Sequence, residues 1–121
     1  MSAPGPDTFL PLNPRVFAIL LSLLEGPAHG YGLKMDVEER SGGAVTLDPG
    51  SLYRSIARLV EDGVLEEVPT PAAEEGEDAR RKYYGLTDLG RAVVQAEASR
   101  LDALLDGTAR RAGLLEGGRG R

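Results

Sequence analysis

Two arginines, Arg54 and Arg58, stand four residues apart in the segment "DPGSLYRSIARLVEDG". The segment opens with Asp48 before Pro49 and ends at Gly63, as is typical of a capped helix. An apolar face repeats along it at helical spacing, formed by Leu52, Ile56, Leu59 and Val60. At about 100° per residue, Arg54 falls nearly opposite this apolar face, and Arg58 flanks Arg54 on the same outward side. A forked guanidinium matches paired acceptors on phosphate or on guanine, so the outward face is a candidate surface for nucleic acid.

Other side chains around this helix could take part in the same chemistry. Ser51 flanks the arginines, and Tyr53 lies at the border of the apolar face, where it either packs or donates its hydroxyl to a phosphate. A basic triplet, Arg80, Arg81 and Lys82, enters a predicted strand further along the chain and would meet backbone phosphates.

Each of these candidates also has a structural explanation. Arg58 could form a local ion pair with Glu61 or Asp62, and the basic triplet could neutralise the acids that precede it. His29, the only histidine, is interpreted as a turn residue hydrogen-bonded near a helix start, in preference to a ligand or a catalytic group.

The net charge of −5 would repel nucleic acid if it were spread evenly. Six acids and no base lie between Gly63 and Ala79, which leaves 13 acids against 14 bases elsewhere. The negative charge therefore belongs largely to one segment and does not describe the other surfaces.

Composition excludes several other classes of protein. At 121 residues and 41% apolar residues, the chain is expected to be one globular domain. Its longest apolar run, "VFAILLSLL", is too short to span a membrane. No cysteine and a single histidine argue against a metal site or a catalytic triad. We expect a cytoplasmic binding protein with no cofactor and no catalytic residues.

The order of predicted elements is helix, helix, short strand, helix, strand, loop, strand, long helix. The first helix runs from Asn13-Pro14 to about Glu25, and the second ends near Ser41. The segment "AVTL" is expected to be extended, and "VLEEVP" and "RRKYYGLT" are predicted to pair as a hairpin. We expect Tyr84 to lie in the core. A helix followed by a hairpin predicts a mainly α fold with a small β-hairpin, the winged helix-turn-helix.

We divide the chain into four parts. Residues 1–12 form a flexible N-terminal arm, 13–86 the winged helix-turn-helix domain, 87–115 a C-terminal dimerisation helix, and 116–121 a flexible tail. The first and last helices carry more apolar surface than the rest of the chain is expected to cover, which favours a homodimer. The expected interface comprises Phe17, Leu20, Leu89, Val93, Leu101, Leu104 and Leu105.

Three segments together resemble the PadR-like family of transcriptional regulators. They are "ILLSLLEGPAHGYGL", "LDPGSLYRSIARLVEDGVLEE" and "RRKYYGLTDLG", in the order and spacing of the family. The resemblance implies a winged helix-turn-helix with a dimerising C-terminal helix, usually a repressor released by a small molecule or a stress signal. It also implies that Gly50 to Tyr53 and the wing strand from Arg80 to Tyr84 meet DNA. Two departures from the family are the acidic wing loop and the absence of tryptophan.

Two functions follow from these patterns. The first is a dimeric, sequence-specific DNA-binding regulator, expected to act as a repressor, that reads a pseudo-palindromic operator and responds to an unidentified small-molecule effector. The second is a winged-helix module that binds a basic protein through its acidic wing.

Overall fold

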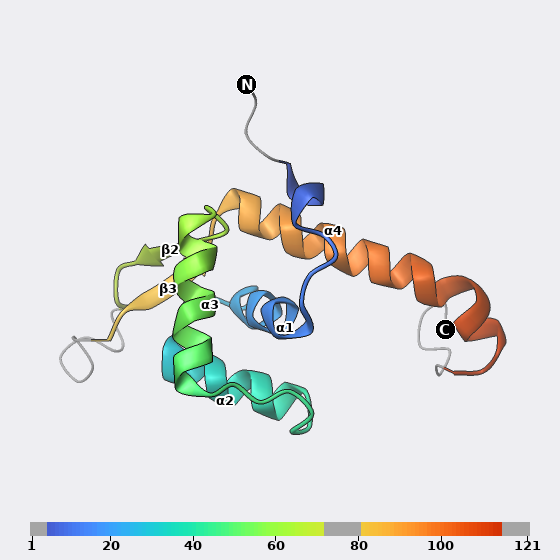
Figure 1. Ribbon diagram of the computed structural model, residues 1–121, viewed down its shortest axis with the longest axis horizontal. Coiled ribbons are helices and arrows are strands. Elements are labelled where there is room, and N and C mark those ends of the chain that lie inside the picture. The colour runs from blue at the N-terminus through green and yellow to red at the C-terminus, as the bar shows by residue number, and fades with distance from the viewer. Residues whose placement is uncertain (1–4, 72–80, 115–121) are drawn as a thin grey trace.

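The computed structural model describes residues 5–71 and 81–114 of the chain. Its elements are η1 (Pro6–Phe9), α1 (Pro14–Leu23), β1 (Ala28–His29), α2 (Gly30–Arg40), α3 (Pro49–Glu61), β2 (Leu65–Val68), β3 (Tyr83–Leu86), α4 (Asp88–Leu104) and η3 (Leu105–Ala109) (Figure 1). Mainly helical structure with a small antiparallel sheet confirms the predicted fold class.

All four α-helices begin at a side chain that accepts a hydrogen bond from a backbone N–H of the first turn. The acceptors are Asn13, His29, Asp48 and Thr87. Such a cap satisfies one of the four N–H groups that a helix start leaves without an intrahelical partner. The sequence predicted the starts at Asn13, Asp48 and Thr87, and the structure confirms them.

The core lies where α1, α2, α3 and the start of α4 meet. Its fully buried side chains come from each of these helices and from the residues before β2: Ile19, Leu20, Leu33, Leu52, Val64, Val93 and Val94. The predicted inward face of α3 is confirmed for Leu52, Ile56 and Leu59, whereas Val60 is exposed. Burial of one face fixes the rotation of α3, so its arginines point outward.

The sheet has three strands in the order β1-β3-β2, all antiparallel. One expectation was wrong here. The extended piece "AVTL" forms no strand, and the third strand is instead β1, which pairs Ala28 with Tyr84 and His29 with Tyr83. Tyr84 packs against the core on the same face of β3 as the buried Leu86 but is only half-buried, whereas Tyr83 on the opposite face is the buried tyrosine.

The N-terminal segment, expected as a flexible arm, docks on the body through Phe9 and Leu10. From Pro6 the chain forms η1 and lies along α4, where Phe9, Leu10 and Leu12 pack against the core (Figure 1). The Leu12 N–H donates to Glu97 Oε2 at 2.8 Å. Apolar contact and this hydrogen bond together hold the segment on α4.

Helix α4 crosses the body and continues beyond it, so that its C-terminal part stands apart from the other elements (Figure 1). There it passes into the π-helical turn η3, which contains Gly107. No helix among residues 5–71 and 81–114 is long and apolar enough to cross a membrane.

The residues expected at a dimer interface separate into three groups by their exposure. Leu20 and Val93 have no exposed surface, because the chain's own core covers them, so they offer nothing to a partner. Phe17, Leu89 and Leu101 are half-buried. Leu104 and Leu105, on the projecting part of α4, are 63% and 40% exposed.

Candidate nucleic-acid interface

Arg54 is an exposed cation on the outward face of α3. Its side chain is exposed, and within the described residues it has no ion pair. The Nη1 atom lies back toward the helix start, close to Gly50. Long helical side chains lean toward the N-terminus in this way. The guanidinium therefore stands near the capped first turn of α3, with its donors directed to solvent.

Arg58 lies one turn further along and has a local partner. Its Nε is 3.3 Å from Asp62 Oδ2, and its side chain is 75% exposed. This is the ion pair that the structural explanation predicted. Exposed pairs at this spacing contribute only about 0.3–0.5 kcal/mol, so the pair is easily exchanged for a stronger acceptor.

The two other α3 candidates sit at the first turn. Ser51 is half-buried, and its backbone N–H donates to Asp48. Tyr53 is 53% exposed, and its ring lies so close to Gly30 that a Cβ there would be 2.7 Å from the hydroxyl oxygen. Tyr53 therefore packs against the start of α2 and keeps about half of its surface exposed.

The basic triplet lies at the base of the wing. Arg81 and Lys82 are exposed and directly precede β3, while Arg80 lies outside the described residues. Arg81 Nη1 is 2.9 Å from His29 Nε2, and the imidazole meets the Tyr83 ring edge-on at 5.2 Å between centroids. The β1–β3 pairing therefore brings the wing cations to the start of α2.

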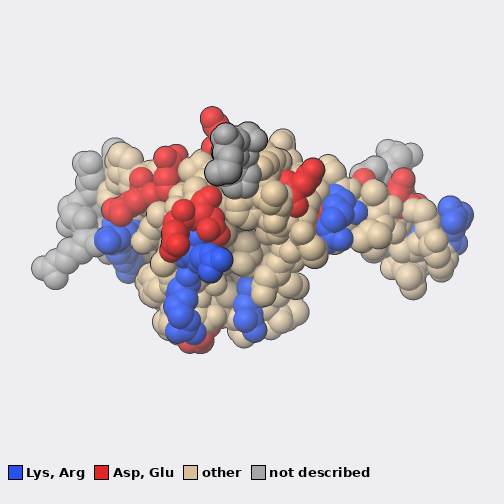
Figure 2. Space-filling view, turned by 45° about the horizontal axis from the view of Figure 1, so that its top comes forward, with Lys and Arg blue, Asp and Glu red and all other residues tan. Residues whose placement is uncertain are grey.

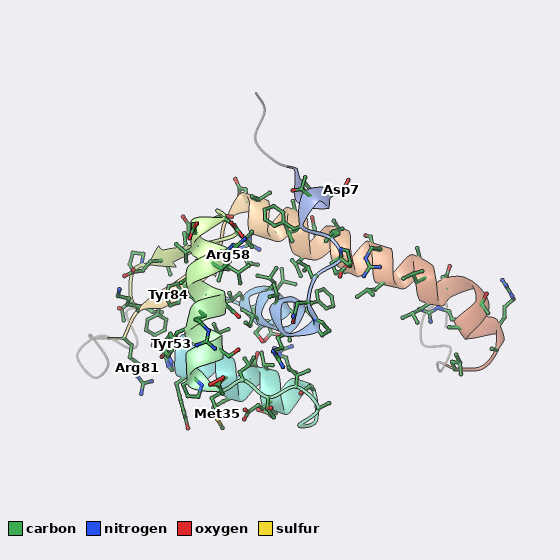
Figure 3. The ribbon with its side chains drawn as sticks, viewed as in Figure 1. Asp7, Met35, Tyr53, Arg58, Arg81 and Tyr84 are labelled. Carbon is green, nitrogen blue, oxygen red and sulfur yellow. The ribbon has the colours of Figure 1, made fainter. Side chains whose placement is uncertain are left out.

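Between these elements lies a hollow of about 490 Å³. It is lined by His29, Gly30, Tyr31, Tyr53, Arg81, Lys82 and Tyr84, so α2, α3 and β3 all contribute to its wall. Figure 3 shows Tyr53, Arg81 and Tyr84 on the same side of the molecule, beside α3. Two cations and several phenol hydroxyls suit a phosphate, whose oxygens accept hydrogen bonds and carry the charge.

The Tyr84 hydroxyl remains protonated well above neutral pH. Burial raises the pKa of Tyr84, and the negative charge of the neighbouring Glu67 raises it further. A protonated phenol is a donor, so near neutral pH Tyr84 offers a hydrogen bond to an anion and no charge against it.

Charges are segregated on this side of the molecule. Over the main body, Asp and Glu atoms gather along the upper edge in Figure 2, and Lys and Arg atoms lie mostly below them. The acids at the far end of α3 and on β2 include Glu61, Asp62, Glu66 and Glu67, all away from the first turn of α3. Of the acidic segment proposed as an alternative docking surface, residues 74–78 lie outside the described residues.

Sequence reasoning missed two features of this surface. These are the contact of His29 with Arg81 and the exposed face of α2 that carries Tyr31 and Met35. Both Tyr31 and Met35 are exposed on α2. Their spacing of four residues placed them on one face, but the buried positions Leu33 and Val37 show which face of α2 turns inward.

Comparisons with known proteins identify the class to which this fold and surface belong. The sequence profile described as the transcriptional regulator PadR-like family matches residues 19–96. The chain therefore belongs to the PadR-like family of transcriptional regulators, a class of regulators and not of enzymes, as the sequence predicted.

Particular relatives agree with this membership. The chain is 35% identical over 86 residues to an uncharacterized 37.1 kDa protein in a transposon of Streptomyces fradiae, and spans 22% of that protein's length. It is similar to a PadR family transcription regulator from Clostridium difficile, with a TM-score of 0.64, 21% identity, and coverage of 78% of this chain and 96% of that one. It is also similar to Bacillus subtilis PadR, solved in complex with operator DNA, with a TM-score of 0.56, 26% identity, and coverage of 71% and 45%.

Proposed function

We propose that the protein is a homodimeric, sequence-specific DNA-binding regulator that inserts α3 into the major groove. The observation that carries this proposal is the exposed Arg54 guanidinium on the outward face of α3, with Arg81 and Lys82 beside the same helix. The operator-bound Bacillus subtilis PadR supports the choice of ligand. The major groove is about 12 Å wide and admits one helix, and an arginine pairs best with the O6 and N7 acceptors of guanine.

The contacts divide into two kinds. Arg54 and Arg58 would reach base edges and supply specificity, since they lie on the outward face of α3. Arg81, Lys82 and Tyr53 would hold the phosphate backbone that passes between α3 and the wing. Ser51, at the first turn of α3, would also contact the backbone. The two kinds predict different consequences when a side chain is removed.

A homodimer follows from the projecting part of α4. Leu104 and Leu105 are exposed there, and Leu101 is half-buried, so an apolar seam continues beyond the body. A partner helix would cover this seam, with Phe17 and Leu89 as further candidates. Two copies of α3 would then lie about 34 Å apart and read a pseudo-palindrome.

Selection from a random pool tests the proposal without a known operator. The full-length protein would be incubated with duplexes that contain a randomised stretch of about two helical turns, and the bound fraction would be sequenced over several rounds. We expect enrichment of an inverted repeat that contains guanine in each half. No enriched sequence, together with binding that vanishes at moderate salt, would contradict sequence-specific function and leave the protein-interaction module as the remaining candidate.

Repression and release by an effector are the finer part of the proposal. A protein that occupies its operator near a promoter excludes polymerase, and a ligand that favours another dimer geometry would lower its affinity. We place the effector between α1 and α4 at the dimer interface, where apolar surfaces meet. A reporter gene placed behind the selected operator would show lower expression when the protein is present; unchanged expression would contradict repression.

A further inference from the structure

His29 stands between two hydrogen-bond donors. Its Nδ1 lies 3.0 Å from the Gly32 backbone nitrogen, where it caps α2, and its Nε2 lies 2.9 Å from Arg81 Nη1. The first contact is local, whereas the second joins residues 52 positions apart through the pairing of β1 with β3. A single imidazole ring therefore touches both the start of α2 and the base of the wing.

The ring cannot accept from both partners at once. A neutral imidazole carries one N–H and one nitrogen lone pair, and the imidazolium has no lone pair. The Gly32 amide is always a donor, and a guanidinium is a donor that does not deprotonate in proteins. If Nδ1 accepts from Gly32, then Nε2 carries the proton and faces a second donor on Arg81. If Nε2 accepts from Arg81, then Nδ1 carries the proton and the cap is lost.

We infer that His29 is a positioning residue that uses its lone pair either to cap α2 or to hold Arg81, and changes between the two by tautomerisation. One ring nitrogen releases its proton to solvent, and the second ring nitrogen takes up a proton from solvent. The net charge of the ring therefore does not change. The link to DNA rests on the proposed function, in which Arg81 contacts a phosphate.

The surroundings of the ring keep its orientation while the proton moves. The Tyr83 ring meets the imidazole at an interplanar angle of 87°, and a Cβ on Gly32 would come within 3.3 Å of its Cε1 atom. On the wall of the hollow, the charged groups beside His29 are Arg81 and Lys82. The neutral phenols of Tyr31, Tyr53 and Tyr84 complete this wall. Within the described residues this wall contains no carboxylate that would favour the imidazolium.

The exchange couples the wing to the helix-turn-helix. When a phosphate accepts the hydrogen bond from Arg81, Arg81 no longer requires His29 Nε2 as an acceptor. The single lone pair of the ring can then reside on Nδ1 and cap α2. DNA binding at the wing should therefore strengthen the first turn of α2. In the DNA-free protein, the same lone pair is shared between two competing donors.

The tautomer can be measured directly because His29 is the only histidine in the chain. Nitrogen-15 NMR of histidine-labelled full-length protein, at a pH where the ring is neutral, distinguishes Nδ1–H from Nε2–H by the two ring shifts. We expect Arg81→Ala to lower the Nδ1–H fraction severalfold and to slow hydrogen exchange at the Gly32 amide. Lys82→Ala, which removes a neighbouring cation of the same charge, serves as the control and should leave both unchanged. Equal tautomer fractions in the wild type and Arg81→Ala, or an equal shift in Lys82→Ala, would overturn the inference.

Addition of the selected operator duplex tests the link to DNA. We expect the Nδ1–H fraction of wild-type His29 to fall when the duplex binds, as it falls in free Arg81→Ala. Binding without any tautomer change would overturn the coupling while leaving the proposed function intact. If no duplex binds at all, the proposed function fails, and the comparison of free Arg81→Ala with free Lys82→Ala still decides whether His29 chooses between its two donors.

Discussion

Arg54 and Arg58 differ in the ion pairs that DNA would have to displace. Arg54 has no ion pair within the described residues, whereas Arg58 must first leave Asp62. The exposed Arg58 pair is worth only a few tenths of a kcal/mol, about 0.3–0.5, so this difference is small beside a bidentate contact with guanine, about 1–3 kcal/mol. Both arginines are therefore suited to reading bases, and Arg54 is the better site to test.

Replacement of Arg54 by alanine should lower affinity for the selected operator by about 1–3 kcal/mol and relax the preference at one base pair of each half-site. The reason is the loss of a paired donor that only guanine satisfies fully. Titration of the variant against single-base substitutions of the operator measures both effects. Arg91→Ala is the matched control, since Arg91 is an exposed arginine on α4 away from the hollow. Equal losses for all base substitutions would show that Arg54 contacts phosphate only.

Replacement of Lys82 by alanine should weaken binding to all duplexes by a similar factor. A lysine that neutralises a phosphate releases about one counterion, so the plot of log affinity against log salt should become shallower by about 1. Affinities at several salt concentrations, for the operator and for an unrelated duplex, provide the measurement. A loss confined to the operator would place Lys82 among the base-reading residues instead.

At the residue scale the sequence predicted what helical periodicity determines. The outward placement of Arg54 follows from the inward Leu52 and Ile56, so it required no knowledge of the rest of the fold. The contact of His29 with Arg81 could not be predicted in the same way. It depends on pairing between a two-residue strand and a distant one, and a strand that short has no periodicity to detect.

Among the elements, α4 lies close to the residue that precedes β2, where Gly90 faces Val64. A Cβ on Gly90 would lie only 2.1 Å from the Val64 carbonyl oxygen, which is a backbone atom that has little freedom to move. Next to this contact, Thr87, the cap of α4, donates its hydroxyl to the Gly63 carbonyl and its backbone N–H to the Val64 carbonyl. The start of α4 is therefore fixed relative to the sheet in two ways. Gly90 permits the close backbone contact, and the capping residue Thr87 adds hydrogen bonds across it.

Gly90→Ala should destabilise the fold by about 1–3 kcal/mol, although alanine is the better helix former, because overpacking at backbone outweighs propensity. Gly107→Ala is the matched control, since its nearest neighbour would be 3.9 Å from the new Cβ. That variant should be neutral or stabilised by up to about 1 kcal/mol. Urea unfolding of both variants measures the difference, and equal stabilities would contradict the tight packing at Gly90.

The buried carboxylate of Glu97 should make stability depend on pH. The hydrogen bond from Arg100 lowers the pKa of Glu97 from its ordinary value of 4.5, and the Leu12 amide lowers it further against the opposing effect of burial. A carboxyl with a depressed pKa stabilises the fold above its unfolded value, and this contribution is lost as the pH falls through the folded value.

Glu97→Gln should therefore melt at a lower temperature than the wild type near neutral pH, with the difference closing as the pH falls below about 4.5. Glutamine keeps an acceptor for the Leu12 amide, so the variant should still fold. Glu39→Gln, at an exposed carboxylate, is the control and should show a constant difference. If the difference in melting temperature between Glu97→Gln and the wild type did not depend on pH, the charge of Glu97 would not stabilise the docked N-terminal segment.

The sequence predicted most elements, because caps and apolar periodicity are local signals. Helices α1, α2 and α3 were expected within a few residues of their observed bounds, whereas α4 begins as expected and ends at Leu104, where it passes into η3. The hydrogen bond that holds the N-terminal segment could not be predicted, since it joins Leu12 to Glu97, and these residues are 85 positions apart. The short strand β1 was placed wrongly at "AVTL" for a similar reason: only pairing with β3 defines it.

For the whole molecule, net charge proved a poor guide to the character of one face. The chain carries −5, yet its wing base and the first turn of α3 present Arg54, Arg81 and Lys82. Segregation of charge is therefore as important as its sum. An acidic remainder would also weaken nonspecific adhesion to DNA, which increases the share of affinity that depends on sequence.

Leu104→Glu should shift the protein from dimer to monomer. A carboxylate placed in an apolar seam between two helices would be desolvated without a partner, at a cost of several kcal/mol. Analytical ultracentrifugation measures the mass directly. Ser99→Glu adds the same charge at an exposed position about 140° away around α4, and should leave the dimer intact. A dimer that survives Leu104→Glu would place the interface elsewhere.

The most direct measurement of the central claim is the affinity of the full-length protein for its selected operator and for a scrambled duplex of equal length, at physiological salt. We expect the operator to bind at least about 1,000-fold more tightly, with two protomers on each duplex, and we expect Arg54→Ala to lower the operator affinity by about 1–3 kcal/mol. Equal affinity for both duplexes, falling together as salt rises, would contradict this claim.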